Sequence, residues 1–291
     1  MRHSEDLTRI RADLSGVPET LLGNLNFRAV AARGPHPVLD DPKAIELVER
    51  IDYPFEHFIG DRTGQRHALR VRTFDEEIRL FLAEYPRGTV VALGEGLETQ
   101  FWRVDNGRVR WLTVDLPEPV ALRRQLLPDE PRRRTLACSA TDTQWMDQVD
   151  SSQGVLITAQ GLLMYLQRGE VERLIHVCAQ RFPGQRLLFD AVPAWMVARQ
   201  GHSKESQRGA YRLASWVWGV DAAERRRLTD LPDVAAFTEL SPPRGRGFLY
   251  GFVLPTLRQL TLLRDYLPGF PVFRVQLATK PGSTHHDDSH Q

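Results

Sequence analysis

The sequence predicts an α/β fold, in which mostly parallel strands alternate with helices around one principal core. Between residues 89 and 190, short β-branched runs alternate with segments of helical periodicity, which is typical of strand–helix–strand units. The first of these runs leads directly into a glycine turn and a helix start. The length of 291 residues exceeds most single cores, but an α/β domain with terminal additions accommodates it.

The composition favours a cytoplasmic globular protein. Hydrophobic residues make up 42% and charged residues 26% of the chain, and no segment has the ~20 apolar residues of a membrane span. Two cysteines cannot form a disulfide framework, and the N-terminus lacks the apolar core of a signal peptide. A net charge of +1 gives no electrostatic case for a nucleic-acid partner, and without an apolar span no membrane partner is expected. We interpret the arginine runs at 132–134 and 225–227 as solvated surface.

Before the first strand, the segments at 42–50 and 67–85 are expected to be helical, within an N-terminal part that covers residues 1–86. The second segment has Ile78, Phe81 and Leu82 on one apolar face. A sheet domain is expected to follow over residues 87–279. Its first five strands are placed at 89–93, 109–114, 135–138, 155–158 and 186–189. The helices between them are placed at 97–103, 117–127, 145–149 and 170–181, with Pro117 at a favourable first helical position.

The C-terminal third is more irregular. An aromatic-rich insertion is expected at 193–219, followed by a strand at 234–239, a helix at 255–266 and a last strand at 272–278. The polar residues 280–291 are expected to form a disordered tail.

The glycine turn after the first strand carries an acid, Glu95, between Gly94 and Gly96. A dinucleotide or nucleoside triphosphate would place phosphates beside such a turn, where the Glu95 carboxylate would repel them. S-adenosylmethionine carries a sulfonium and an ammonium group and no phosphate. The turn therefore favours this cofactor, although a tight strand-to-helix turn can also use glycine for purely structural reasons.

Polar residues follow the other strands, at the edge where open parallel sheets bind ligands. Asp115 lies ~20 residues after the glycine turn, the spacing at which an acid reaches ribose hydroxyls, although it could also cap the next helix. Asp142 and Thr143 follow the third strand, where a carboxylate could accept a hydrogen bond from an adenine amino group or cap a helix. Gln160 follows the fourth strand, and Tyr165 lies five residues later.

Several segments in order resemble the leucine carboxyl methyltransferase family, and most closely its bacterial branch of polyketide O-methyltransferases. The resemblance covers most of residues 18–190. Its segments are residues 19–22, 28–29, 40–44, 72–75, 90–100, 111–117, the pair Asp142 and Trp145, and 160–166. It implies a Rossmann-like class I methyltransferase fold, with a mostly parallel seven-stranded sheet, an N-terminal helical cap and a C-terminal insertion, that binds S-adenosylmethionine.

The resemblance also implies residue roles. Arg72 would hold the methionine carboxylate, because a guanidinium fork matches two oxygens. The expected cofactor-binding set is Arg72, Gly94, Glu95, Gly96, Asp115, Leu116, Asp142, Thr143 and Gln160. The expected substrate-binding set is Arg28, Tyr165, Trp195, Tyr211 and Trp216, and the residues expected at the reacting groups are Gln160 and Tyr165.

Four positions depart from the family pattern. Glu95 stands where a small residue is usual, Glu98 where an Asp is usual, Gln160 where a Glu is usual, and Thr113 where an acid is common. Glu98 keeps its charge. The neutral Gln160 removes a negative charge near the cationic donor, and Glu95 could restore one from another direction, so we expect a cofactor site that is rearranged rather than lost.

Methyl transfer from a sulfonium mainly requires alignment and the exclusion of water. A carboxylate acceptor is already nucleophilic, whereas a phenol or alcohol benefits from a base such as histidine. His67 and His202 are the histidines best placed to approach the pocket, but neither has an identifiable partner. The aromatic residues of 193–219 could form an acceptor wall or could simply pack the cap. The histidines at 285, 286 and 290 lack ligand geometry, so no metal is expected.

Three functions remain open at this point. The first is a small-molecule O-methyltransferase with a carboxyl or phenolic acceptor, of the secondary-metabolite type. The second is an enzyme in which a nucleophile attacks the γ-carbon of the same cofactor, giving aminocarboxypropyl transfer or ring closure with release of methylthioadenosine. The third is a non-catalytic protein that binds S-adenosylmethionine. The sequence gives no expectation for the oligomeric state.

Overall fold

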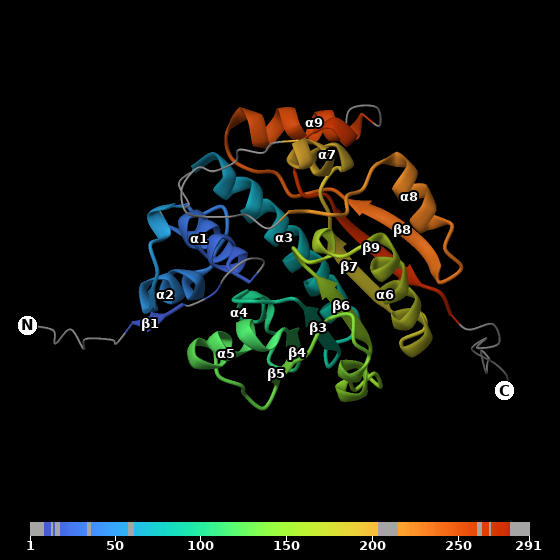
Figure 1. The fold of residues 1–291 in the computed structure, drawn as a ribbon, viewed down its shortest axis with the longest axis horizontal. Coiled ribbons are helices and arrows are strands. Elements are labelled where there is room, and N and C mark those ends of the chain that lie inside the picture. Colours follow the sequence, from blue (N-terminus) through green and yellow to red (C-terminus); the bar gives the residue numbers. More distant parts are fainter. Residues whose placement is uncertain are drawn as a thin grey trace, which may run out of the picture.

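The computed structural model describes residues 9–12, 14, 18–33, 36–57, 61–202, 215–260, 264–267 and 269–279. A twisted central sheet carries helices on its two faces, and the N-terminal helices lie beside one end of it (Figure 1). The expected disordered tail at 280–291 lies outside the described residues.

The sheet has seven strands, in the order β5-β4-β3-β6-β7-β9-β8. The strands are β3 Thr89–Leu93, β4 Arg110–Asp115, β5 Arg133–Ala137, β6 Val155–Ala159, β7 Arg186–Asp190, β8 Val234–Leu240 and β9 Val272–Leu277. β9 pairs antiparallel with both β7 and β8, whereas the other pairings are parallel. The order reverses between β3 and β6, and this is the point at which open sheets bind ligands. The seven-stranded, mostly parallel fold is therefore confirmed.

The strands β3 and β6 are buried along their whole length, because helices cover both faces of the sheet. One face packs against α6 Arg168–Arg181, and the other packs against α3 Asp61–Glu84 and α4 Gln100–Val104. On this second face Phe74, Ile78 and Phe81 from α3 meet Trp111 of β4. The hydrophobic effect on these two faces holds the strand ends in register.

The N-terminal part contains α1 Thr20–Ala32 and α2 Pro42–Arg50, which precede α3. Asp41 caps α2 by accepting a 3.1 Å hydrogen bond from the Ala44 amide. Leucines of α1 and α2 pack against Leu97 and against α5 Pro117–Leu126. A short parallel pair joins β1 Ile10–Arg11 to β2 Ile51–Asp52. The cap helices thus lie directly beside the glycine turn, although the domain boundary at residue 86 stays a prediction.

The C-terminal part differs most from expectation. The stretch expected to be irregular contains α7 Ala194–His202, and α8 Ala222–Thr229 precedes β8. The helix expected at 255–266 is a π-helical turn, Leu249–Val253 (η4), followed by α9 Leu254–Gln259. Short 3-10 turns complete the described elements: Phe55–His57, Gln144–Gln148 (η2), Leu163–Tyr165 (η3) and Arg264–Tyr266. No helix in the described ranges has both the length and the apolar character that a bilayer span requires.

Candidate active site

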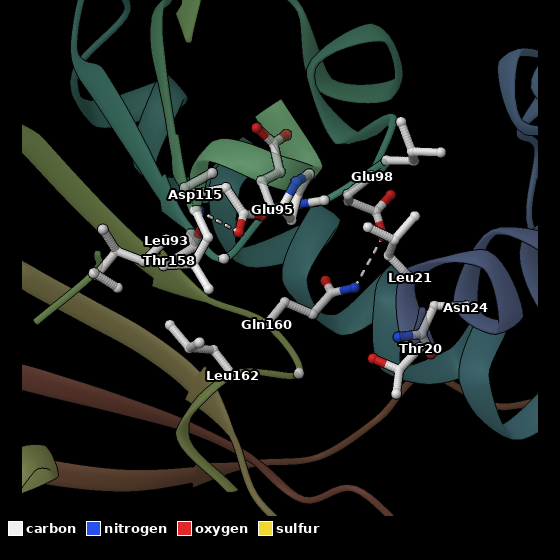
Figure 2. A pocket seen from close by; sticks show the side chains of 18 of the residues that line it. Thr20, Leu21, Asn24, Leu93, Glu95, Glu98, Asp115, Thr158, Gln160 and Leu162 are labelled. Atoms are coloured by element: carbon white, nitrogen blue, oxygen red, sulfur yellow. Dashed lines mark hydrogen bonds between the residues drawn. The ribbon is translucent and has the colours of Figure 1, made fainter. Parts of the chain in front are cut away.

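A cavity opens at the carboxyl ends of β3, β4, β5 and β6, where α1 covers them (Figure 2). It leaves about 280 Å³ for the centres of water-sized molecules. Eight of the residues expected to bind cofactor or substrate line it: Arg28, Gly94, Glu95, Gly96, Asp115, Leu116, Gln160 and Tyr165. The predicted strand-end placement of these residues therefore matches the cavity.

The glycine turn is shaped by close packing and by its backbone angles. Gly94 and Gly96 have φ angles of 62° and 53°, in the left-handed region where glycine is favoured. A Cβ on Gly94 would lie 3.0 Å from Leu162 Cδ1, and one on Gly96 would lie 3.0 Å from Leu21 Cβ. The turn therefore presents bare backbone to the cavity because a side chain has no room there.

Asp115 is half-buried at the end of β4 and faces the turn (Figure 2). Its Oδ2 accepts a 2.6 Å hydrogen bond from the Gly96 amide, and its Oδ1 accepts a 2.8 Å bond from the Leu116 amide. Each carboxylate oxygen has a second lone pair. Asp115 is thus held rigidly with acceptor capacity left for two hydroxyl groups.

Glu95 does not act as its sequence position suggested, because its carboxylate points into the protein interior. It accepts hydrogen bonds from the Trp111 ring N–H at 3.1 Å and from the Thr113 hydroxyl, and it pairs with Arg123 at 3.1 Å. The expectation that its charge would face the cofactor is wrong, and only its backbone remains beside the turn. The Glu95 carboxylate is bound by Thr113, so these two departures from the family pattern contact each other.

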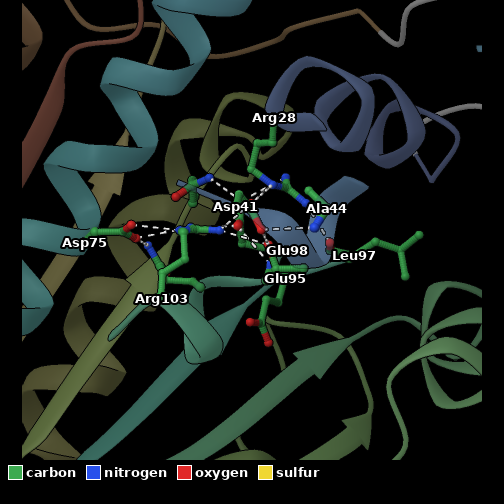
Figure 3. A network of polar contacts seen from close by, with 12 residues as sticks. Arg28, Asp41, Ala44, Asp75, Glu95, Leu97, Glu98 and Arg103 are labelled. Carbon is green, nitrogen blue, oxygen red and sulfur yellow. Dashed lines mark hydrogen bonds and ion pairs between the residues drawn. The ribbon is translucent and has the colours of Figure 1, made fainter. Parts of the chain in front are cut away.

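Glu98, by contrast, belongs to a buried ionic network between the cap and the sheet (Figure 3). Its carboxylate pairs at 2.9 Å with both Arg28 and Arg103. Arg103 also pairs with Asp41 at 2.7 Å and with Asp75 at 2.8 Å. Charge pairs of this kind persist in a protein interior only when hydrogen bonds satisfy them. The network fixes Glu98 at the rim of the cavity.

Burial opposes the charge of Glu98, but Arg28 and Arg103 outweigh it and lower the pKa of Glu98 to about 2. Because the folded pKa lies below the ordinary value of 4.5, this group stabilises the fold fully above pH 4.5, and its contribution is lost as the pH falls towards 2. We expect Glu98→Gln to lower the free energy of unfolding at pH 7 by on the order of 3 kcal/mol. Urea unfolding should show this cost shrinking below pH 4.5. A cost that is the same at pH 7 and pH 3 would contradict the role given to the carboxylate.

Gln160 connects this network to the cavity. Its Nε2 donates a 3.0 Å hydrogen bond to Glu98 Oε2, whereas its Oε1 is buried without a hydrogen-bond partner. An unpaired buried acceptor is costly. A ligand that donates a hydrogen bond at this point would remove that cost, and the Glu98 carboxylate beside it favours a positively charged donor.

Two arginines line the cavity, but Arg72 is not one of them. Arg72 pairs with Glu76 at 3.5 Å and lies in a separate surface depression. The prediction that Arg72 binds the cofactor is therefore at odds with its position. Residues two apart on a helix point to opposite sides, and Arg70 is the α3 arginine that reaches the cavity.

The two cavity arginines differ in their free donors. All three nitrogens of Arg28 have partners, namely Asp41, Glu98 and the Leu97 carbonyl, so Arg28 supports the wall. Arg70 donates to Asp190 at 2.9 Å, and its Nε is buried without a partner. Arg70 therefore keeps a donor for an anionic ligand.

The residues expected to hold adenine are exposed and lie just beyond the cavity. Asp142 and Thr143 belong to the turn that leads into η2, and neither lines the opening. β5 ends at Ala137, so the positions at its tip are Ser139, Ala140 and Thr141. The hydroxyls of Ser139 and Thr141 are 2.8 Å apart, and both residues line the cavity at this strand end, which Asp142 does not.

The aromatic residues divide between the cavity and the core. Tyr165 lines the cavity beside Thr20 and Trp216, and burial raises the pKa of its hydroxyl, so it stays protonated at neutral pH. Trp195 and Trp216 do not line the cavity, and Trp218 is buried with its ring N–H bonded to Glu224. Packing is therefore the role supported for Trp218. Tyr211 lies outside the described residues.

The histidines expected near the pocket do not provide a base in the described cavity wall. His67 stacks on Phe27 with ring centroids 4.6 Å apart and is absent from that wall. Burial, followed by the charges of Arg70 and Arg66, holds the pKa of His67 well below its usual value. Nothing is described for the His202 side chain.

The described cavity wall fits the parts of S-adenosylmethionine. Asp115 can bind the ribose hydroxyls, the unpaired oxygen of Gln160 with Glu98 can bind an ammonium group, and Arg70 can bind a carboxylate. The bare glycine turn leaves room for the chain that joins them. The sequence did not single out Arg70, Ser139, Thr141, Thr20 or Asn24, because only the fold brings these residues to the cavity.

Comparison with known proteins shows the family of the chain. A sequence model of the leucine carboxyl methyltransferase family matches residues 22–179, more than half of the chain. The chain is 35% identical over 209 residues to the tetracenomycin polyketide synthesis O-methyltransferase TcmP of Streptomyces glaucescens, which spans 71% of this chain and 76% of that protein. It is 30% identical over 194 residues to an S-adenosyl-L-methionine-dependent methyltransferase of Gibberella zeae, and the match spans 60% of this chain and 65% of that protein.

A solved structure agrees in fold alone. A DUF574 family protein from Streptomyces avermitilis superposes with a TM-score of 0.52 at 11% identity, covering 87% of this chain and 96% of that one. The expectations for family, enzyme class and cofactor are thereby confirmed. The chain belongs to the leucine carboxyl methyltransferase family and is an S-adenosylmethionine-dependent methyltransferase.

Proposed function

We propose that the protein transfers the methyl group of S-adenosylmethionine to a carboxylate or hydroxyl oxygen of a small molecule. The observation that carries this proposal is the buried, unpaired Oε1 of Gln160 beside the Glu98 carboxylate, at the rim of the glycine turn. This pair suits the ammonium group of the donor. Asp115 faces the same cavity from the other side, where the ribose would lie.

The chain's own residues would hold and orient the donor. The unpaired oxygen of Gln160 would bind its ammonium group beside the charge of Glu98, Arg70 its carboxylate and Asp115 its ribose, with Ser139 near the adenine. The bound donor supplies an electrophilic methyl group on a sulfonium. The protein then contributes alignment and water exclusion, which are the main requirements of an in-line displacement.

Tyr165 would orient the acceptor. Its protonated hydroxyl can donate a hydrogen bond but is not a base at neutral pH. A carboxylate acceptor is already nucleophilic and needs no base, so it suits this donor directly. A phenol would have to arrive ionised or lose its proton to a group outside the described wall.

The relatives support a small-molecule acceptor, because TcmP is named for polyketide synthesis. A secondary metabolite is therefore the acceptor class we propose. Both cysteines, Cys138 and Cys178, are free and buried, which fits the proposed cytoplasmic location.

The identity of the nucleoside product tests this proposal. The protein is incubated with S-adenosylmethionine alone and then with aromatic carboxylic acids and phenols, and the products are separated by liquid chromatography with mass spectrometry. We expect adenosylhomocysteine together with a methylated acceptor. Methylthioadenosine formed without any acceptor would instead show attack on the γ-carbon and would contradict methyl transfer.

A further inference from the structure

A second, smaller cavity adjoins the active site behind Arg70. It lies between α3, the segment after β8, and η4 with α9. It leaves about 40 Å³ for the centres of water-sized molecules. One water needs roughly 10–15 Å³ by this measure, so the cavity has room for one small group rather than a whole metabolite.

Three guanidinium groups converge on this cavity, which we call the arginine pocket (Arg66, Arg70 and Arg258). Arg66 and Arg70 are one helical turn apart and face the same way, and Arg258 approaches from α9. The Nε atom of Arg66 is buried without a partner, as is that of Arg70, which the cofactor carboxylate is proposed to take on the active-site side. Within the described part of the chain, Arg66 and Arg258 form no hydrogen bond or ion pair. Buried donors without an acceptor are costly, so an anionic group would relieve them.

The surrounding acids do not balance these charges. Asp190 bonds to Arg70, and Glu239 faces Arg258 but is also 3.6 Å from Arg225, which in turn pairs with Asp265. Among the described residues, the three arginines of the pocket and Arg225 face three acids, so the described arginines outnumber the described acids by one. The pKa of His67 is lowered by burial and then by the positive charges of Arg70 and Arg66, two of the three arginines of the pocket.

We propose that the arginine pocket binds a carboxylate of the methyl acceptor, separate from the oxygen that receives the methyl group. The guanidinium fork matches the two oxygens of a carboxylate. The apolar walls, which include Leu69, Pro255 and Phe270, suit an organic acid better than a free inorganic anion. Arg70 lines both cavities, so an acceptor held in the pocket would have to extend past this side chain to reach the donor.

This inference rests on the proposed function for the source of the carboxylate. It adds that the acceptor is an organic acid that keeps one carboxylate free in its methylated product. The arginine pocket therefore anchors the acceptor, while the reacting oxygen lies in the active-site cavity beside Tyr165.

Calorimetry with 4-hydroxybenzoate and with its amide tests the pocket, using protein saturated with adenosylhomocysteine. We expect millimolar or tighter binding of the acid and binding of the amide weaker by about tenfold or more. Arg66→Gln and Arg258→Gln should each weaken the acid about tenfold, with adenosylhomocysteine affinity unchanged. The control Arg72→Gln makes the same charge change on α3 outside the pocket, and it should leave binding of the acid unchanged.

Stability provides a second readout. If these arginines mainly hold the fold together, Arg66→Gln and Arg258→Gln will lower the urea midpoint. If they form a binding pocket, each variant removes an unbalanced charge, and the urea midpoint should stay unchanged or rise. The proposal is overturned if the acid fails to bind, if the two variants bind it like the wild type, or if inorganic phosphate binds more tightly than the acid. Failure of adenosylhomocysteine to bind the wild type is a separate result, and it would overturn the proposed function itself.

Discussion

Arg103→Met is expected to lower the free energy of unfolding by about 3–5 kcal/mol, because it leaves buried carboxylates without their shared cation. The Arg103 side chain is 5% exposed and pairs with Asp41, Asp75 and Glu98. These acids come from the loop before α2, from α3 and from the segment after the glycine turn (Figure 3). Urea unfolding at pH 7 measures the effect.

Arg110→Met is the matched control, since it removes an arginine from an exposed pair. Arg110 and its partner Asp150 are 57% and 42% exposed, and such surface pairs contribute about 0–1 kcal/mol. An Arg103→Met cost within that same range would mean that the buried network does not hold the cap against the sheet.

Asp115→Ala is expected to weaken adenosylhomocysteine binding by roughly 10–100-fold, because hydrogen bonds to a charged acceptor are worth about 1.5–3 kcal/mol. The carboxylate is already oriented by the amides of Gly96 and Leu116. It therefore meets ribose hydroxyls without reorganisation. Isothermal titration calorimetry on both proteins measures the change.

Asp142→Ala provides the comparison, because Asp142 is exposed and lies outside the cavity wall. We expect the affinity of this variant for adenosylhomocysteine to stay within about threefold of the wild type, which is a difference in binding free energy well under about 1 kcal/mol. An equal loss of adenosylhomocysteine affinity in the two variants would show that Asp142 contacts the cofactor. An Asp115→Ala variant that binds adenosylhomocysteine like the wild type would contradict the ribose-binding role of Asp115. Urea midpoints of both variants establish that each remains folded.

The fold could largely be read from the sequence, because buried parallel strands appear as unbroken apolar runs. The expected bounds of β3 match the structure, and those of β6 differ from it by one residue at the C-terminal end. α1 was missed because its buried side includes Gly23, Asn26 and Arg28, which break the apolar periodicity. Those polar residues are buried because distant parts of the chain satisfy them, as Asp41 and Glu98 do for Arg28.

The site was predicted at the level of strand ends but less well at the level of side-chain direction. Arg72 was chosen where Arg70 reaches the cavity, since only the orientation of α3 decides which of the two faces inward. Glu95 turns away because Trp111, Thr113 and Arg123 bind it from other elements. Such partners lie far away in sequence, and local patterns do not reveal them.

Binding of adenosylhomocysteine to the folded wild-type protein, measured by calorimetry, tests the cofactor cavity most directly. We expect saturable binding at one site per chain, with no competition from ATP or NAD. A flat titration on protein that is shown to be folded, or displacement by those phosphate-bearing nucleotides, would contradict a cavity built for a phosphate-free sulfonium nucleoside.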